Sequence, residues 1–380
     1  MSVGVAILGS TGSIGRTALQ VLARQRERFH IAALTAYSNA ALLQRQADEW
    51  RPAYLGLVNG GRRETGGGVS GGPACLVEAA TRSDVDIVVN AIVGSAGLEA
   101  TLAALRAGKR VALANKETLV MAGELVIAAA REGGGEIVPV DSEHSAVLQC
   151  IAGRPPSDVA RLILTASGGP FRTWSAERVA RATVDEALQH PTWKMGKKIS
   201  VDSATLVNKA LEVIEAHFLF GLGYAAVEVV VHPQSVMHAF VEFVDGSVLA
   251  QVGFPTMELP ILYALTHPDR VPDAGARRFD PVAAGTLTFE PVDAERYPAY
   301  GLGRAAALVG GTAPTVFNAA NEVAVELFLV GEIPFGRIAT TIGRVLDAHR
   351  LASPGSARSL AAVLEADAEA RRLAREAACS

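Results

Sequence analysis

Val3-Gly-Val-Ala-Ile-Leu-Gly9-Ser-Thr-Gly12-Ser-Ile-Gly15, at the start of the chain, is typical of an apolar strand, a tight glycine turn and the first turn of a helix. Three glycines at this spacing let the backbone turn sharply and approach a pyrophosphate, which the N-terminus of the following helix stabilises. The pattern therefore predicts a dinucleotide site. An ordinary glycine-rich strand-to-helix turn is the alternative.

Strand-like and helix-like segments continue to alternate after this turn, which implies βαβ crossovers and a parallel sheet. We expect an N-terminal Rossmann-like parallel-sheet domain over residues 1–150. The expected strands and helices are residues 3–8, 30–35, 85–91, 110–114 and 136–140, and residues 16–25, 98–107 and 118–131 respectively. Residues 60–73 are dense in glycine, which predicts a flexible surface loop.

The pattern changes after about Cys150, where strand-like runs alternate with longer irregular connections. We expect a central α+β catalytic domain with an open sheet and a closing loop over residues 151–290. Its strands are expected at residues 160–165, 227–231, 239–243 and 247–253, and Asp245-Gly246 predicts a type I′ hairpin turn. A C-terminal helical domain is expected over residues 291–380, from helical segments at residues 300–329 and 333–379.

The composition excludes several classes of protein. The chain has 380 residues, of which 49% are hydrophobic and 19% charged, so it can form well-buried cores. A net charge of -4 gives no general attraction to nucleic acid or to an anionic membrane. Three scattered cysteines, no export signal and no membrane-spanning run predict a soluble cytoplasmic protein.

Acidic and polar side chains follow two of the expected strands, where ligands bind in parallel sheets. Asn115-Lys116-Glu117 follows one strand, and Asp141-Ser142-Glu143 follows the next. On an extended strand end both carboxylates could face the same way and offer hard oxygen ligands to Mg²⁺ or Mn²⁺. A helix N-cap or a solvated turn is the alternative.

A second polar cluster is expected on a helix running from Asp202, with Asp202 or Ser203 as its cap. Ser203 and the charge of Lys209 predict a phosphate site, and Glu212 offers a third carboxylate to the metal. A solvated helix face with one Lys–Glu pair is the alternative.

Two loops and one strand end add to the predicted site. The flexible backbone after Ser167 could wrap a phosphate, and residues 190–198, with Trp193, suit a lid that excludes water. His190 is equally consistent with a structural hydrogen bond. The second strand ends in Tyr37-Ser38-Asn39 and has no acid for a ribose hydroxyl, which favours NADP over NAD.

These segments, taken in order, resemble the 1-deoxy-D-xylulose 5-phosphate reductoisomerase family from Gly9 to about Leu329. The motifs are GSTGSIG, ANKE, VDSEH, SGGPF, HPTWKMG, KISVDSATLVNKALE, HPQSVMH and NAANEVAV. The resemblance implies conversion of 1-deoxy-D-xylulose 5-phosphate to 2-C-methyl-D-erythritol 4-phosphate in non-mevalonate isoprenoid biosynthesis. It also implies NADPH, Mg²⁺ or Mn²⁺, and a homodimer.

The resemblance also implies roles for individual residues. The metal ligands would be Asp141, Glu143 and Glu212. The phosphate ligands would be Ser167, Ser203, Asn208 and Lys209. Further contacts with the substrate would come from Lys116, Ser142, Glu143 and His190, with His190 and Trp193 on the closing loop. The cofactor ligands would be Thr11, Gly12, Ser13, Ile14, Asn39, Asn115, Glu117 and Gly196.

The chain departs from the family pattern in ways that bear on function. Tyr37-Ser38-Asn39 replaces Gly-Lys-Asn, which removes a lysine suited to the 2′-phosphate and leaves relaxed cofactor specificity as an alternative. Ala210 and Phe254 replace a glycine and a glutamate. The rival hypotheses are a plain NAD(P)-dependent dehydrogenase without rearrangement, and an inactive nucleotide-binding sensor. Metal-dependent turnover separates both from a reductoisomerase.

Overall fold

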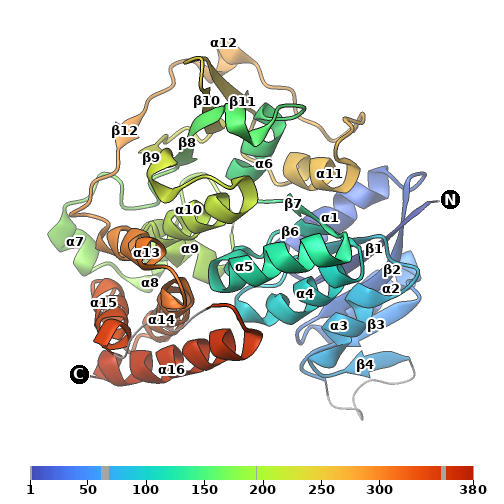
Figure 1. Ribbon diagram of the computed structural model, residues 1–380, viewed down its shortest axis with the longest axis horizontal. Coiled ribbons are helices and arrows are strands. Elements are labelled where there is room, and N and C mark those ends of the chain that lie inside the picture. Colours follow the sequence, from blue (N-terminus) through green and yellow to red (C-terminus); the bar gives the residue numbers. More distant parts are fainter. Residues whose placement is uncertain (1, 61–67, 194, 352–356, 380) are drawn as a thin grey trace. The chain divides into compact units, whose positions relative to one another are not determined.

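The computed structural model describes residues 2–60, 68–193, 195–351 and 357–379 (Figure 1). The chain forms two compact units, and each contains segments that are distant in sequence. The first unit comprises Met1–Thr118, Val126–Leu148 and Thr256–Arg278. The second comprises Leu119–Leu125, Gln149–Pro255 and Phe279–Ser380.

The first unit is built on a parallel sheet with the strand order β4-β3-β2-β1-β5-β6-β7. Its strands are β1 Val3–Leu8, β2 Phe29–Ala36, β3 Tyr54–Leu57, β4 Val69–Gly71, β5 Ile87–Asn90, β6 Arg110–Leu113 and β7 Glu136–Pro139. The predicted Rossmann-like sheet is confirmed. The prediction of a loop over residues 60–73 was wrong at β4, and its residues 61–67 lie outside the described part of the chain.

Helices pack on both faces of this sheet. The helices that begin in this unit are α1 Ser13–Arg24, α2 Ala40–Trp50, α3 Ala74–Thr81, α4 Leu98–Arg106, α5 Lys116–Gly133, α6 Ser142–Cys150 and α11 Glu258–Thr266. Apolar side chains of α1, α2 and α11 share one core with inward-facing residues of β1, β2, β5 and β6. Arg24 fixes the returning segment with α11 by ion pairs to Glu258 and Asp273, each 2.6 Å long.

The second unit contains a mixed sheet with the order β11-β10-β8-β9-β12, which confirms the open-sheet α+β prediction. Its strands are β8 Val159–Ala166, β9 Val227–Val231, β10 Met237–Phe243, β11 Val248–Val252 and β12 Glu290–Pro291. The β10–β11 hairpin is confirmed, but the predicted type I′ turn was wrong. Only Gly246 in the turn has a positive φ, of 83°, which suits a three-residue loop.

Helices form the larger core of this unit, and the last four confirm the predicted helical C-terminal region. They are α7 Ala176–Ala180, α8 Val184–Leu188, α9 Lys197–Ala204, α10 Val207–Phe220, α12 Pro281–Ala284, α13 Pro298–Val309, α14 Ala313–Leu329, α15 Arg337–Leu351 and α16 Leu360–Cys379. Side chains of α9, α10 and α13–α16 pack in one cluster. The division at residues 150 and 290 stays a prediction. No described helix is long and apolar enough to cross a bilayer.

Candidate active site

The glycine turn after β1 has the geometry of a pyrophosphate cradle. Gly9 has φ of 85°, and Gly12 occupies the N-cap of α1, where it places no side chain over the first-turn N–H groups. A Cβ on Gly15 would lie 2.3 Å from the Gly9 carbonyl oxygen. Ser10 and Gln46 brace the turn through two buried hydrogen bonds. Thr11 thus lies in the turn before α1, and Ser13 and Ile14 lie in the first turn of that helix, where backbone N–H groups are free to bind an anion.

The other predicted cofactor residues of the first unit have structural partners. Asn39 caps α2 by accepting a hydrogen bond from the Leu42 N–H. Asn115 caps α5 and is fully buried. Its amide donates to the Ile92 and Gly94 carbonyls and to Glu117, which fixes the loop after β5 against the start of α5. These bonds shape the carboxyl edge of the sheet.

Asp141 and Glu143 lie together just after β7. A carboxylate oxygen of Asp141 is within 4.8 Å of a carboxylate oxygen of Glu143. The explanation from an extended strand end was wrong, because α6 begins at Ser142 and Glu143 lies in its first turn. Lys116 donates to Asp141 over 2.8 Å, and the Ser142 hydroxyl donates to Glu143 over 2.6 Å. Both carboxylates are thus oriented by neighbours, as ligands of a hard cation require.

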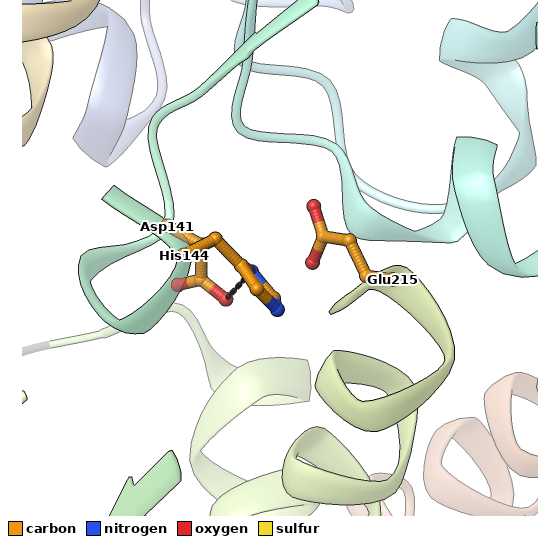
Figure 2. Close-up of side chains that lie close together, drawn as sticks. All are labelled: Asp141, His144 and Glu215. Carbon is orange, nitrogen blue, oxygen red and sulfur yellow. Dashed lines mark ion pairs between the residues drawn. The ribbon is translucent and has the colours of Figure 1, made fainter. Parts of the chain in front are cut away.

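Two buried side chains close in sequence to the predicted metal ligands, His144 and Glu215, were missed. His144 is fully buried, and its Nδ1 lies 3.7 Å from an Asp141 oxygen in the ion pair drawn in Figure 2. Figure 2 also shows the Glu215 carboxylate on α10, in the second unit, and its side chain is 1% exposed. Both stand three residues after a predicted ligand, Asp141 or Glu212, which is the helical spacing that could have found them.

The expected helix from Asp202 is in fact two helices. Leu206 has φ of 55° and separates α9 from α10, so Asp202 and Ser203 lie in the last turn of α9 and cap no helix start. The prediction of a cap at Asp202 or Ser203 was wrong. Buried Asp202 is held by Lys198 at 2.9 Å and by the Asn321 amide at 2.8 Å, which anchors the turn that carries Ser203.

Asn208, Lys209 and Glu212 form one bonded group on α10. The Asn208 amide donates to one Glu212 oxygen over 2.6 Å, and Lys209 pairs with the other. Lys209 and Glu212 are 4% and 1% exposed, so the alternative of a solvated helix face is wrong. A buried ion pair is weak evidence for stability, because desolvation offsets its attraction.

Ser167 is arranged to donate its hydroxyl hydrogen. His190 Nδ1 accepts from the Thr192 and Trp193 N–H groups, which leaves the proton of the neutral ring on Nε2. That Nε2 lies 2.9 Å from the Ser167 hydroxyl, which also accepts from the Gly169 N–H. With both lone pairs engaged, the hydroxyl is oriented to donate to an anion.

The Ser167 loop lies against the end of α9. A Cβ on Gly169 would be 2.7 Å from the Ser203 carbonyl oxygen, so only glycine permits this approach. Gly196, predicted to bind the cofactor, is the exposed N-cap of α9 and lies within the predicted lid segment, residues 190–198, of which Lys194 is outside the described part of the chain. The structure thus gathers Ser167, His190 and Ser203 in one region of the second unit.

We expect His190 to stay neutral throughout the physiological range. Burial lowers its pKa to about 4, whereas the unfolded side chain has a pKa of about 6.5. Between these values the unfolded chain binds a proton that the folded chain does not, so this contribution to stability is complete above pH about 6.5 and is lost as pH falls toward 4. An NMR titration, assigned with His190→Gln, checks this. A ring that titrates near pH 6.5 would contradict it.

The fold and these side chains define a class first: nucleotide-binding α/β enzymes with a doubly wound sheet and clustered carboxylates. The family follows from comparisons with known proteins. Family models match residues 5–123 (1-deoxy-D-xylulose 5-phosphate reductoisomerase), residues 137–220 (its C-terminal domain) and residues 252–373 (DXP reductoisomerase C-terminal domain). The chain belongs to the 1-deoxy-D-xylulose 5-phosphate reductoisomerase family, as its motifs predicted.

Individual relatives match over nearly the whole chain. The 1-deoxy-D-xylulose 5-phosphate reductoisomerase of Ralstonia nicotianae is 49% identical over 97% of this chain and 96% of its own length. That of Symbiobacterium thermophilum is 48% identical over 99% of both chains. A solved DOX-P reductoisomerase in complex with NADPH, fosmidomycin and magnesium superposes with a TM-score of 0.94, at 40% identity and coverage of 99% and 98%. The Zymomonas mobilis enzyme in complex with NADPH has a TM-score of 0.91, at 42% identity over the full length of both chains.

Proposed function

We propose that the chain converts 1-deoxy-D-xylulose 5-phosphate to 2-C-methyl-D-erythritol 4-phosphate with NADPH and a divalent metal, within non-mevalonate isoprenoid biosynthesis. The observation that carries this proposal is the full-length similarity to reductoisomerases at close to half identity. The oriented carboxylates support it, as does the Ser167 hydroxyl, which is oriented to donate a hydrogen bond to an anion.

We propose Asp141, Glu143 and Glu212 as the ligands of Mg²⁺ or Mn²⁺. Three carboxylates are the hard oxygen donors that these cations prefer. Hydrogen bonds already orient each of them: Lys116 holds Asp141, Ser142 holds Glu143, and Asn208 holds Glu212. When bound, the metal supplies Lewis-acid polarisation of the neighbouring substrate oxygens.

The remaining predicted residues bind and shield the substrate. Ser167, Ser203, Asn208 and Lys209 are proposed to hold the phosphate, which supplies binding energy remote from the reacting carbons. Lys116, Ser142, Glu143 and His190 are proposed to contact the sugar. The segment with His190 and Trp193 is proposed to close over the site and to exclude water while hydride is transferred.

The cofactor proposal assigns the dinucleotide to the glycine turn and its neighbours. Thr11, Gly12, Ser13 and Ile14 would meet the pyrophosphate at the start of α1. The further ligands proposed are Asn39, Asn115, Glu117 and Gly196. NADPH is the proposed hydride donor, and the solved relatives with NADPH support it.

Ser38 is the position at which we expect cofactor preference to be adjustable. Tyr37-Ser38-Asn39 presents no cation where β2 ends, and Tyr37 is 68% exposed. Ser38→Lys is expected to tighten NADPH binding about tenfold and to leave NADH binding unchanged, since a new cation meets only the 2′-phosphate. Binding titrations with both cofactors, using Ser38→Gln as control, measure this. An equal change for both cofactors would contradict the assignment.

We also propose that the chain is a homodimer and acts in the cytoplasm. β11 lies at one edge of the mixed sheet, and Val248 and Leu249 on it are 49% and 40% exposed. A sheet edge with exposed apolar residues is a common site of association. Sedimentation at several concentrations tests the dimer, and a monomer at all of them would reject it.

The reaction itself is tested by identifying the product. Purified protein, NADPH, Mg²⁺ and 1-deoxy-D-xylulose 5-phosphate are expected to yield the branched erythritol phosphate, identified by NMR. A reduced but unbranched product would instead indicate a plain dehydrogenase. Absence of any product would favour the inactive sensor.

A further inference from the structure

Tyr297 is a buried side chain that the proposed chemistry does not use. It stands at the N-cap of α13 and is 2% exposed. Its hydroxyl donates to the Gly168 carbonyl over 2.8 Å, across 129 residues of sequence. Burial raises the pKa of Tyr297, so the hydroxyl keeps the proton that it donates.

The ring of Tyr297 packs in a small cluster with Ala166 and Leu206. Ala166 is the last residue of β8 and directly precedes Ser167. Leu206 is the left-handed residue that separates α9, with Ser203, from α10, with Lys209. One aromatic ring therefore contacts both segments that carry the proposed phosphate ligands.

The loop that Tyr297 contacts needs an external tether. Gly168 and Gly169 both have left-handed backbone conformations, with φ of 82° and 62°. Glycine adopts positive and negative φ about equally readily, so the chain by itself does not hold this conformation. Arg296 fixes the far end of the loop, because its guanidinium donates to the Arg172 and Trp174 carbonyls. The Tyr297 hydroxyl fixes the near end, one residue after Ser167.

We propose that Tyr297 is a positioning residue that holds the Ser167 loop and the start of α10 in register for the substrate phosphate. The inference rests on the proposed function, because it takes Ser167, Ser203 and Lys209 as phosphate ligands. It goes beyond that function by placing the control of phosphate affinity on a segment about 130 residues away in sequence.

Tyr297→Phe tests this inference, because it removes one oxygen and keeps the ring that packs on Ala166 and Leu206. The buried Gly168 carbonyl loses its donor, so the loop should relax. The KM for 1-deoxy-D-xylulose 5-phosphate is expected to rise about 5- to 20-fold, and the inhibition constant of inorganic phosphate to rise with it. We expect kcat to change less than about twofold, and NADPH affinity to stay unchanged.

Controls separate this inference from the function on which it rests. Tyr224→Phe, which removes the hydroxyl of another partly buried tyrosine of the second unit, should leave both constants unchanged. Ser167→Ala should raise both. If Ser167→Ala raises them and Tyr297→Phe only lowers the melting temperature, Tyr297 is merely structural and the inference fails alone. If neither variant alters phosphate inhibition, the phosphate site itself is misplaced.

Discussion

Glu212→Gln is expected to lower kcat by on the order of a thousandfold, while NADPH affinity stays within about twofold of the parent. The substitution keeps the size of the side chain but removes the charge that a divalent ligand set needs. Lewis-acid stabilisation is worth several kcal/mol, and each 1.36 kcal/mol changes a rate tenfold. Steady-state kinetics across a Mg²⁺ titration, with NADPH binding measured separately, give both quantities.

The control for Glu212→Gln is Glu228→Gln. Glu228 is a carboxylate on β9 of the same unit and pairs with Arg161 at the surface. It should retain full activity. Equal loss of turnover and of NADPH binding in Glu212→Gln would show that Glu212 is misplaced. A full return of activity at high Mg²⁺ would reduce its role to metal affinity.

Gly15→Ala is expected to weaken NADPH binding by about 10- to 100-fold. A Cβ at this position would lie 2.3 Å from the Gly9 carbonyl oxygen and 2.6 Å from the Ser10 Cα, so α1 must move away from the turn. Overpacking of this kind costs about 1–3 kcal/mol, which is the origin of the expected range. Fluorescence titration with NADPH measures the affinity.

Gly301→Ala is the matched control for Gly15→Ala. Gly301 lies in α13, where a Cβ would have no heavy atom within 4 Å, and alanine is a better helix former. It should bind NADPH normally and be no less stable. If Gly15→Ala also binds NADPH normally, the pyrophosphate does not lie at this turn.

The elements that could be predicted from sequence are those with local signals. β1, β2 and β6 are apolar runs, and the glycine turn is visible in the spacing of its residues. By contrast, β3 and β4 were missed because 4 and 3 residues are too few to show a period. The helices α2 and α3 were missed as well, although the 11 residues of α2 are enough to show a buried face at Leu43, Gln46 and Ala47. The return of α11 to the first unit also escaped prediction, since it depends on contacts such as Arg24–Asp273 across the chain.

The burial of the α10 cluster could not be predicted for the same reason. The sequence of α10 is amphipathic, but α13 also packs against this helix. The residue of α13 that allows the close approach is Gly303. A Cβ on Gly303 would lie 2.5 Å from the Ala210 Cβ. The methyl of Ala210 is thus accommodated by a glycine 93 residues later. The burial of Lys209 and Glu212 therefore depends on tertiary contacts that no local pattern shows.

The chemical types of the candidate site residues are visible in the sequence, whereas the local geometry around them is not. The residues at the end of β7 were chosen for their carboxylates, although α6 rather than a strand end brings Asp141 and Glu143 together. Similarly, Ser203 was predicted to cap the start of a helix. The left-handed Leu206 separates α9 from α10, so Ser203 lies in the last turn of α9 instead. The chemical types of side chains are visible in a sequence, whereas the break at Leu206 leaves no local mark.

The most direct test of the account is NADPH oxidation with 1-deoxy-D-xylulose 5-phosphate, measured with Mg²⁺ and again with excess EDTA. The account predicts oxidation that depends on both the substrate and the metal, that EDTA abolishes, and that added Mg²⁺ or Mn²⁺ restores. Oxidation that persists unchanged in EDTA, or no oxidation by a folded protein that binds NADPH, would contradict it.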